Sequence, residues 1–413
     1  MALCALLSGH LSAQAVEIVA AIHYSSEYTT NTLLTDDNEI GEWVHAPGVN
    51  LVAQHDSAAL ALDVGYDYIR RIYQKDIFQD ENVLTGVSTA RWYALPQRLD
   101  FFVSNFRTES TVRARQAETQ ANRQVISNTS AGSTLRFRPR GADELQFEYS
   151  FHDINANQTR TDSKRHNATA RYLVGLSANR GLQMETTYSN IEYEGLFPDA
   201  QFLIASIGYS QTSRMLDLDI NVGYNWYDRE ERGSTGDPTY QAALTWRPTP
   251  TATLAANAFH GIVDQSTSLD GTGSAVENTG INAAFVETRG DLDLSQSFGR
   301  TVLTIGGSWV QEEYANDVPL DNSRIGGRVA LSRNLTRRTS LTITGDYSNR
   351  DFRDQGDEQD EVRADLRASH RINRSLELSG TVSFQKRAAQ TSRSYEEWRS
   401  GLALYYTFWG ASR

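Results

Sequence analysis

The sequence predicts an all-β fold, a single transmembrane antiparallel up-and-down β-barrel of about 18–20 strands. Three observations predict it. Segments of about 10 to 14 residues with alternating apolar and polar side chains recur from residue 16 to the end. Short and long separators between these segments alternate strictly. The chain has no apolar run of about 18 residues, so it contains no candidate transmembrane helix.

The first 15 residues differ from the rest of the chain. They contain a short apolar run followed by Ala13-Gln14-Ala15, a small-x-small sequence of the kind that signal peptidase cleaves. Because no basic residue opens the run, either the start codon is assigned wrongly or the segment is not a signal. We expect the first of these, with residues 1–15 a truncated signal peptide. Residues 16–413 would then form the barrel. Cys4, the only cysteine, lies in the leader, so the mature chain would hold no disulfide and no thiolate metal site.

The separators are of two kinds. Short ones rich in turn-forming residues lie at 55–58, 95–98, 139–142, 179–181, 213–215, 248–251, 298–300, 334–338 and 373–375. Longer, more charged ones lie at 29–42, 74–82, 113–124, 156–164, 195–199, 229–238, 266–277, 315–322, 354–361 and 389–395. Short periplasmic turns and longer extracellular loops are typical of an outer-membrane barrel. Counting segments gives about 20 strands, with 18 as the alternative because residues 276–298 and the first strand are poorly delimited.

The alternation divides each segment into two faces. Leu60, Leu62 and Val64 share one face, whereas Asp63 and Asp67 share the other. The same division places Asp217 and Asp219 opposite an aliphatic face. Since a charge that points toward lipid costs up to a few kcal/mol at the membrane midplane, we expect the charged face to line the lumen.

Arginines follow the same rule. The inward-facing arginines predicted from their spacing are Arg136, Arg138, Arg171, Arg324, Arg328, Arg363, Arg367, Arg371 and Arg399. Two interpretations remain open. Rings of arginine favour anions in wide pores, which would make the lumen anion-selective. Alternatively, these arginines pair with luminal acids such as Asp346 and Asp365 and only stiffen the wall.

Tryptophans give an independent indication of the membrane. Near the ends of predicted strands lie Trp43, Trp92, Trp226, Trp246, Trp309, Trp398 and Trp409. Aromatic side chains gather in this way at the two interfaces of a membrane. The pattern therefore supports a bacterial outer-membrane location, with the outer-membrane lipid as the first partner.

Other functions are disfavoured. A net charge of -12 argues against a nucleic-acid partner. The histidines occur singly without ligand spacing, and the chain has no G-x-S-x-G motif. We therefore expect no enzyme activity, no catalytic residue, no metal and no cofactor. The tripeptide Arg289-Gly290-Asp291 sits in an alternating segment and is interpreted as chance.

The last segment carries a family resemblance. Residues 398–408 alternate and end in Phe408, which resembles the closing strand of bacterial outer-membrane barrels, although five residues follow here. Leu-x-Leu-x-Gly and Gly-Tyr patterns at residues 62–66, 220–224 and 376–380 extend the resemblance to barrel families encoded with bacterial exopolysaccharide synthesis and export systems. This resemblance covers nearly the whole mature chain and transfers no functional residue.

What the resemblance implies is a porin-like channel that takes part in exopolysaccharide export, with a polysaccharide and periplasmic export components as further partners. The alternatives are a general or solute-specific diffusion porin, and a non-conducting surface adhesion or structural barrel. We expect any constriction to come from inward-folded loops such as residues 29–42 or 266–277. The sequence leaves the oligomeric state and the transported substrate open.

Overall fold

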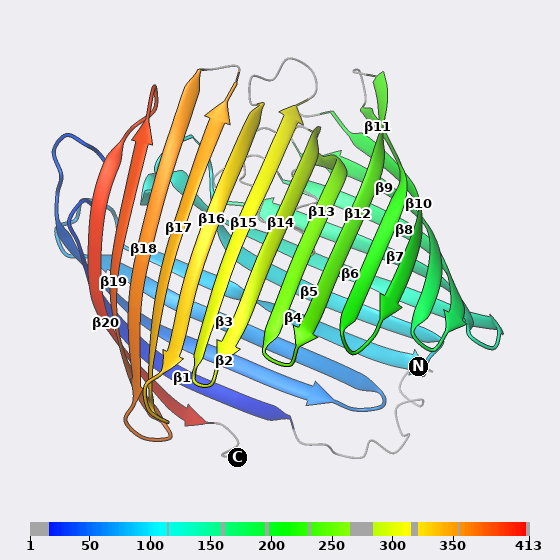
Figure 1. The fold of residues 1–413 in the computed structure, drawn as a ribbon, viewed down its shortest axis with the longest axis horizontal. Helices are drawn as coiled ribbons and strands as arrows, with labels where there is room; N and C mark the ends of the chain where they lie inside the picture. The colour runs from blue at the N-terminus through cyan, green and yellow to red at the C-terminus, as the bar shows by residue number, and fades with distance from the viewer. Residues whose placement is uncertain are drawn as a thin grey trace, which may run out of the picture.

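The computed structural model is a closed antiparallel barrel (Figure 1). It describes residues 16–113, 115–157, 162–194, 198–229, 233–264, 284–314, 321–353 and 356–409, so the predicted signal peptide and the predicted loop at 266–277 lie outside the described residues. The sheet has 20 strands, each paired with its neighbour in the chain, and β1 pairs with β20 to close it. The all-β, up-and-down fold and the count of 20 rather than 18 are confirmed.

The strand bounds follow the predicted alternating segments. They are Glu17–Thr29 (β1), Glu42–Asp56 (β2), Leu60–Tyr73 (β3), Glu81–Leu95 (β4), Leu99–Thr111 (β5), Arg123–Arg140 (β6), Asp143–Ala156 (β7), Ser163–Ser177 (β8), Arg180–Tyr193 (β9), Ala200–Thr212 (β10), Leu216–Arg229 (β11), Gly233–Thr249 (β12), Ala252–Asp264 (β13), Ala284–Phe298 (β14), Thr301–Tyr314 (β15), Asn322–Asn334 (β16), Thr339–Phe352 (β17), Asp357–Arg371 (β18), Leu376–Ala389 (β19) and Tyr395–Trp409 (β20). A 3-10 turn, Gln120–Asn122, precedes β6. Among the described residues, no helix has the length and apolar character needed to cross a membrane.

The two ends of the barrel differ. Even-numbered strands end in short turns at what we call the turn end, and odd-numbered strands end in the connections of the loop end, most of which are longer. Two predicted long loops are wrong. β11 and β12 reach Arg229 and Gly233, and β17 and β18 reach Phe352 and Asp357, so residues 233–238 and 357–361 of these predicted loops are strand.

The physical reason for these two errors lies in the strand ends. On β18, Glu358 and Asp360 occupy the same face as the exposed, apolar Val362. A strand that projects beyond the membrane meets water on its outer face, where a charge costs little. Charge density therefore does not mark the end of a strand there. Gly356, with a φ of 57°, adopts the left-handed conformation just before β18 begins.

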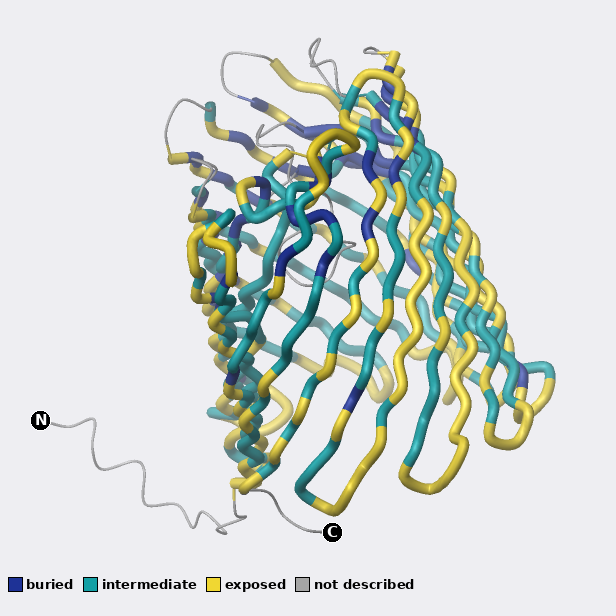
Figure 2. The backbone as a smooth tube through the Cα atoms, turned by 90° about the vertical axis from the view of Figure 1, so that its left-hand side faces the viewer, coloured by how far each residue is buried: buried dark blue, intermediate teal, exposed yellow. Residues whose placement is uncertain are grey.

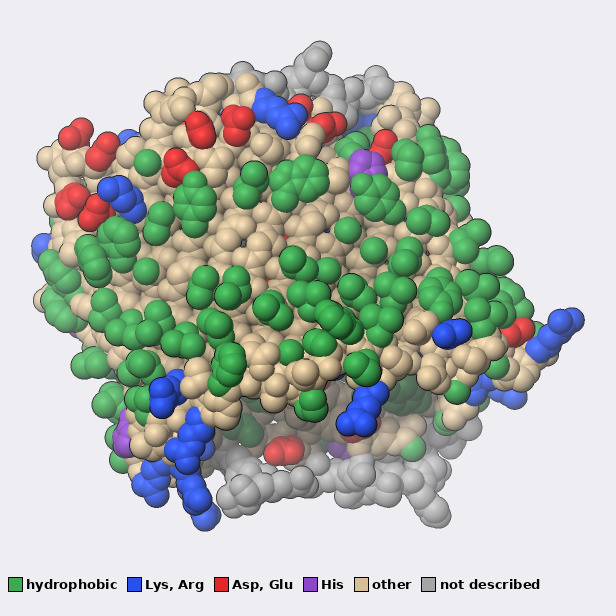
Figure 3. All heavy atoms as spheres, viewed as in Figure 1, with side chains coloured by type: hydrophobic (Ala, Val, Ile, Leu, Met, Phe, Trp, Pro, Cys, Tyr) green, Lys and Arg blue, Asp and Glu red, His purple; other side chains and the backbone are tan. Residues whose placement is uncertain are grey.

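An apolar belt crosses the face of the outer wall that Figure 3 shows, and exposed apolar side chains lie on strands around the whole sheet. Exposed Leu, Val, Ile, Phe and Tyr side chains alternate with polar ones along the strands. Trp43, Trp92, Trp226, Trp246, Trp309 and Trp398 are between 40% and 51% exposed and lie near strand ends. In Figure 3 acidic groups gather toward the loop end and basic groups toward the turn end. This surface is the one that a lipid-embedded barrel needs.

Buried side chains are concentrated at the loop end (Figure 2). One apolar cluster joins β9 to β14 and consists of Ile191, Tyr193, Ala200, Phe202, Tyr227, Ile262 and Ala284. A second cluster joins Leu34, Ala117 and Tyr395. Because Leu34 and Ala117 belong to connections rather than strands, this second cluster shows that loops fold inward.

Candidate functional site

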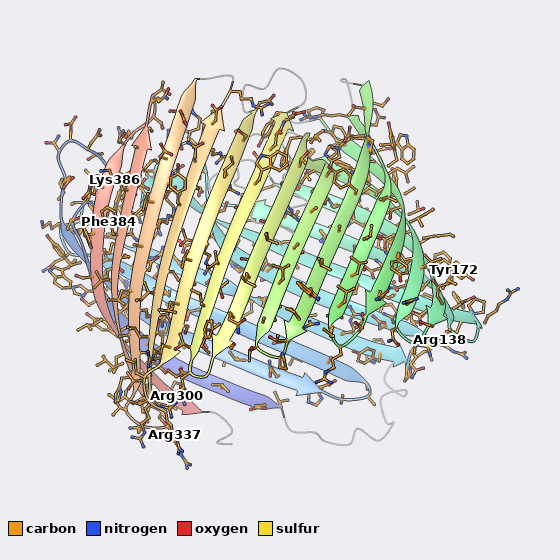
Figure 4. The ribbon with its side chains drawn as sticks, viewed as in Figure 1. Arg138, Tyr172, Arg300, Arg337, Phe384 and Lys386 are labelled. Carbon is orange, nitrogen blue, oxygen red and sulfur yellow. The ribbon has the colours of Figure 1, made fainter. Side chains whose placement is uncertain are left out.

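The predicted inward residues lie on one face of the wall. On β18, Val362 and Leu366 are 40% and 42% exposed on the outside, and Arg363 and Arg367 occupy the alternate positions. The same parity holds for Arg371 on β18 and, on other strands, for Asp63, Asp67, Arg136, Arg171, Asp217, Asp219, Arg324, Arg328 and Arg399. Arg138 lies next to the turn between β6 and β7, near the rim in Figure 4.

The connection between β5 and β6, described at residues 112–113 and 115–122, folds inward and is called the inner loop. Asn122, 4% exposed, holds its shape. The Asn122 side-chain amide donates to the carbonyl oxygens of Arg113 at 2.9 Å and Ala117 at 3.1 Å, and its oxygen accepts the N–H of Arg113 at 2.8 Å. One buried side chain therefore bonds backbone groups of Arg113 and Ala117 and ties this part of the loop to its C-terminal end.

The inner loop is anchored to a distant part of the wall. Arg115 donates to Asp357 at 3.3 Å and lies over the ring of Phe352, with 5.6 Å between its guanidinium carbon and the ring centroid. Ala117 packs against Leu34 and Tyr395. Strands β1 to β4 separate β5 from β20 in the sheet, so these contacts carry the loop across part of the barrel opening.

Asp357 is the centre of this anchor. Its carboxylate is fully buried and accepts the N–H groups of Thr391 at 2.9 Å and Ser392 at 3.2 Å, and the amide of Gln359 at 2.8 Å. Burial alone would raise the pKa of Asp357, but the hydrogen bonds from Thr391, Gln359 and Ser392 lower this pKa well below its usual range. The residue lies at the loop end, beyond the apolar belt, and stays ionised in mildly acidic water.

The inner loop presents one acidic side chain to the lumen. Glu118 is exposed and lines two hollows at once. The first contains Arg71, Arg123 and Arg399, and the second contains Arg324, Arg328 and Arg363. Within the described part of the chain, no hydrogen bond or ion pair engages the Glu118 carboxylate. A free carboxylate thus stands between two groups of arginines.

Most of the predicted inward arginines are paired with acids. The pairs are Arg136–Asp100, Arg138–Glu144 (3.1 Å), Arg171–Glu185 (2.5 Å), Arg328–Asp346 (3.7 Å), Arg363–Glu361 (2.7 Å) and Arg399–Glu397 (2.9 Å). Among the predicted acids, Asp67 lies 2.9 Å from His23 and Asp217 lies 2.6 Å from Arg247. This pairing favours the interpretation that the arginines stiffen the wall. Arg324, Arg367 and Arg371 have no acidic partner within 4.0 Å among the described residues.

The two remaining predicted acids have weaker contacts. Asp219 accepts a hydrogen bond from the amide of Asn221 at 2.8 Å. Asp63 lines a hollow near the turn end together with Glu17 and Arg91. Neither of them reaches the inner loop.

Sequence reasoning missed two parts of the site. Arg71 shares the face of Asp63 and Asp67, so the alternation could have found it; it binds Glu109 at 2.6 Å and Glu81 at 2.9 Å. Glu118 lies in a connection without periodicity, where alternation gives no direction. Of the two loops expected to constrict the lumen, residues 29–42 contribute Leu34 to the inner-loop cluster.

Comparisons with known proteins bear on the fold. No protein-family model and no curated protein matches the sequence. Among solved structures, the siderophore receptor PirA from Acinetobacter baumannii superposes with a TM-score of 0.54 at 9% identity, over 95% of this chain and 80% of that chain. The FrpB iron transporter from Neisseria meningitidis (F5-1 variant) gives 0.53 at 8% identity, over 94% of this chain and 82% of that chain.

These similarities show the fold. The chain is a large barrel of the bacterial outer membrane, built like outer-membrane transporters and carrying the exposed apolar belt that this location requires. What PirA and FrpB bind or carry is not transferred to this chain.

Proposed function

We propose that this barrel is a passive outer-membrane channel for small polar solutes, with the turn end toward the periplasm and the inner loop as its constriction. One observation carries the proposal: the inner loop is anchored at both sides of the opening, by Asn122 near β6 and by Arg115 on Asp357 of β18. A loop held in this way narrows a lumen that 20 strands would otherwise leave wide.

The charges beside the inner loop bear on selectivity. The hollow between Glu118 and β14 to β18 is lined by six acidic side chains, Glu118, Asp291, Asp293, Asp346, Glu361 and Asp365, and by three arginines. Rings of acidic side chains favour cations. We therefore expect small cations to pass the constriction more readily than small anions, and the inward arginines to act there mainly through their ion pairs.

Single-channel conductance of the refolded chain in planar bilayers tests this function. Asp357→Asn removes the charge that holds Arg115, so the inner loop should loosen and the conductance should rise. Asp351→Asn is the matched control because Asp351 is exposed at the same end of β17. An unchanged conductance in Asp357→Asn would contradict the constriction. A wild-type barrel that inserts without conducting would contradict the channel and favour a structural or adhesion barrel.

Exopolysaccharide export is the second candidate. One luminal feature favours it: the ring of Tyr405 stacks on His23 with 5.4 Å between centroids, and His23 bonds to Asp67 at 2.9 Å. An aromatic face next to a carboxylate offers a sugar ring both a packing surface and a hydrogen-bond acceptor. A neutral or anionic polysaccharide added at the turn end should then block the current, whereas a solute channel would be blocked only by small molecules.

A further inference from the structure

Arginines without acidic partners gather at the turn end of β14 to β19. One hollow there is lined by Arg300 from the turn after β14, Arg337 and Arg338 from the turn after β16, and Arg371 at the end of β18. Figure 4 shows Arg300 and Arg337 together at this end of the barrel. In Figure 3 basic side chains lie below the apolar belt in the same region.

Backbone hydrogen bonds fix the three turns beside one another. The N–H of Asn334 donates to the carbonyl of Arg300 at 2.9 Å, and the N–H of Arg371 donates to the carbonyl of Arg338 at 2.8 Å. The turn after β16 is further held by Thr336, whose hydroxyl accepts the N–H of Arg338 at 3.0 Å. These hydrogen bonds therefore hold the backbone segments that carry the arginines in fixed positions beside one another.

The hollow is not neutralised by the protein. Its single acidic lining residue is Glu377, and although Glu377 faces Arg371 across β18 and β19, the two form no ion pair within 4.0 Å. Within the described ranges, no acid pairs with any of the four arginines. This arrangement contrasts with the paired arginines higher in the lumen. Four like charges around one hollow repel one another, and a multiply charged anion would relieve that repulsion.

The lining groups match one kind of anion. Guanidinium groups donate pairs of parallel hydrogen bonds that fit the oxygens of a phosphoryl group. Asn334, Ser340 and Ser369 add uncharged donors to the same hollow. Ser369 and Arg371 lie on the luminal face of β18, whereas the exposed, apolar Leu335 and Ile372 mark the outer face. The hollow therefore opens toward the lumen and the solvent rather than toward lipid.

We propose that this hollow is a binding site for a phosphoryl dianion of a soluble periplasmic compound, located at the exit of the lumen. The four arginines supply the charge and the paired donors, and the hydroxyl groups orient the remaining oxygens. The site does not depend on whether the lumen conducts. It belongs to the turn end of β14 to β19, away from the inner loop.

Pyrophosphate binding to the detergent-purified full chain, measured by titration calorimetry at low ionic strength, tests the site. We expect saturable binding by the wild type and at least a tenfold loss of affinity in the double variant Arg337→Gln/Arg338→Gln. The control Arg180→Gln/Arg214→Gln removes the same charge from exposed positions at the same end and should bind like the wild type. Arg300→Gln gives a milder second variant if the double variant does not fold, and should weaken binding in the same direction.

Three outcomes would overturn the proposal: no binding by the wild type, equal losses in the double variant and its control, or an unchanged affinity in the arginine variants. A further comparison separates the two sources of phosphate. In nanodiscs, phosphatidylglycerol in place of phosphatidylcholine should leave pyrophosphate binding unchanged, and competition by phosphatidylglycerol would assign the site to a lipid headgroup instead. Because calorimetry reads binding without conduction, a failed channel would leave this result intact.

Discussion

Glu118 is the acidic side chain that the inner loop presents to the lumen. It is exposed, lines both hollows beside the inner loop and has no ion-pair partner in the described part of the chain. The inward arginines around it are largely neutralised by wall acids, as the pair of Arg399 with Glu397 at 2.9 Å illustrates. A charge that is free to meet a passing ion affects permeation more than a charge that is already paired.

Replacing Glu118 by Gln should reduce the preference for cations. One charge near the path is worth about 1 kcal/mol or less in a wet lumen, so the cation-to-anion permeability ratio should fall by up to about fivefold. Reversal potentials in a salt gradient measure this ratio. Glu39→Gln is the matched control, since Glu39 is exposed in the connection between β1 and β2. A ratio that stays constant in Glu118→Gln would place the selective charges elsewhere.

The lowered pKa of Asp357 predicts how the anchor responds to acid. A carboxyl whose folded pKa is depressed contributes stability above its unfolded pKa, about 3.9, and loses it only as the pH falls through the folded value. The inner loop should therefore stay closed from pH 7 to about pH 3, below the pH at which exposed aspartates titrate.

Protection of the inner loop from a protease measures this closure over the pH range. The wild type should be protected at both ends of the range, and Asp357→Asn should be cleaved at both. Loss of protection in the wild type at about pH 4 would show that Asp357 titrates in its ordinary range.

At the level of single residues, the sequence predicted on which face of its strand a side chain lies, but it did not predict the partner of that side chain. Alternation is a property of one strand, so it placed Arg363 and Arg171 on the inner face. Pairing depends on the register between neighbouring strands, which sets Arg171 opposite Glu185. Glu118 could not be predicted at all, because a non-periodic connection gives its side chains no expected direction.

At the scale of elements, turn chemistry and alternation were sufficient for the strand order. Membrane strands must alternate because one face meets lipid, so each short polar separator marked a turn. The errors at residues 229–238 and 354–361 arose where strands leave the membrane and the constraint ends. Inward folding of the inner loop depends on Arg115 and Asn122 within the loop and on Asp357, which lies 242 residues beyond Arg115 in the sequence.

Gly86, in β4, has an unusual backbone conformation. Its φ of 148° is a conformation that side chains rarely adopt, and a Cβ there would overlap the carbonyl oxygen of Gly65 and lie 2.7 Å from the Cα of Tyr66. Gly86→Ala should therefore destabilise the barrel by about 1–3 kcal/mol. The midpoint of urea unfolding, followed by heat-modifiable mobility on gels, measures the loss.

Gly65→Ala is the control on the neighbouring strand, because an added Cβ there meets nothing within 4 Å. It should unfold with the wild type. If both variants lose stability equally, the effect would come from the loss of glycine itself rather than from strain at Gly86.

At the scale of the whole molecule, the two ends of the barrel differ. Its loop end carries the buried clusters, the inner-loop anchor and many acidic groups, whereas its turn end carries exposed arginines such as Arg300 and Arg337. The apolar belt between them fixes the depth of the barrel in the membrane but not its direction. Direction must follow from the ends, because short turns are the segments that can stay in the periplasm while longer connections reach the surface.

Cysteine labelling in cells tests this direction. The sole cysteine, Cys4, lies in the predicted signal peptide, so the mature barrel offers a low background. Asp36→Cys, in the exposed connection after β1, should react with a membrane-impermeant maleimide on intact cells. Arg374→Cys, in the turn after β18, should react only after the outer membrane is permeabilised. The reverse pattern would invert the barrel, placing the inner loop on the periplasmic side and the arginine hollow at the cell surface, where a periplasmic ligand could not reach it.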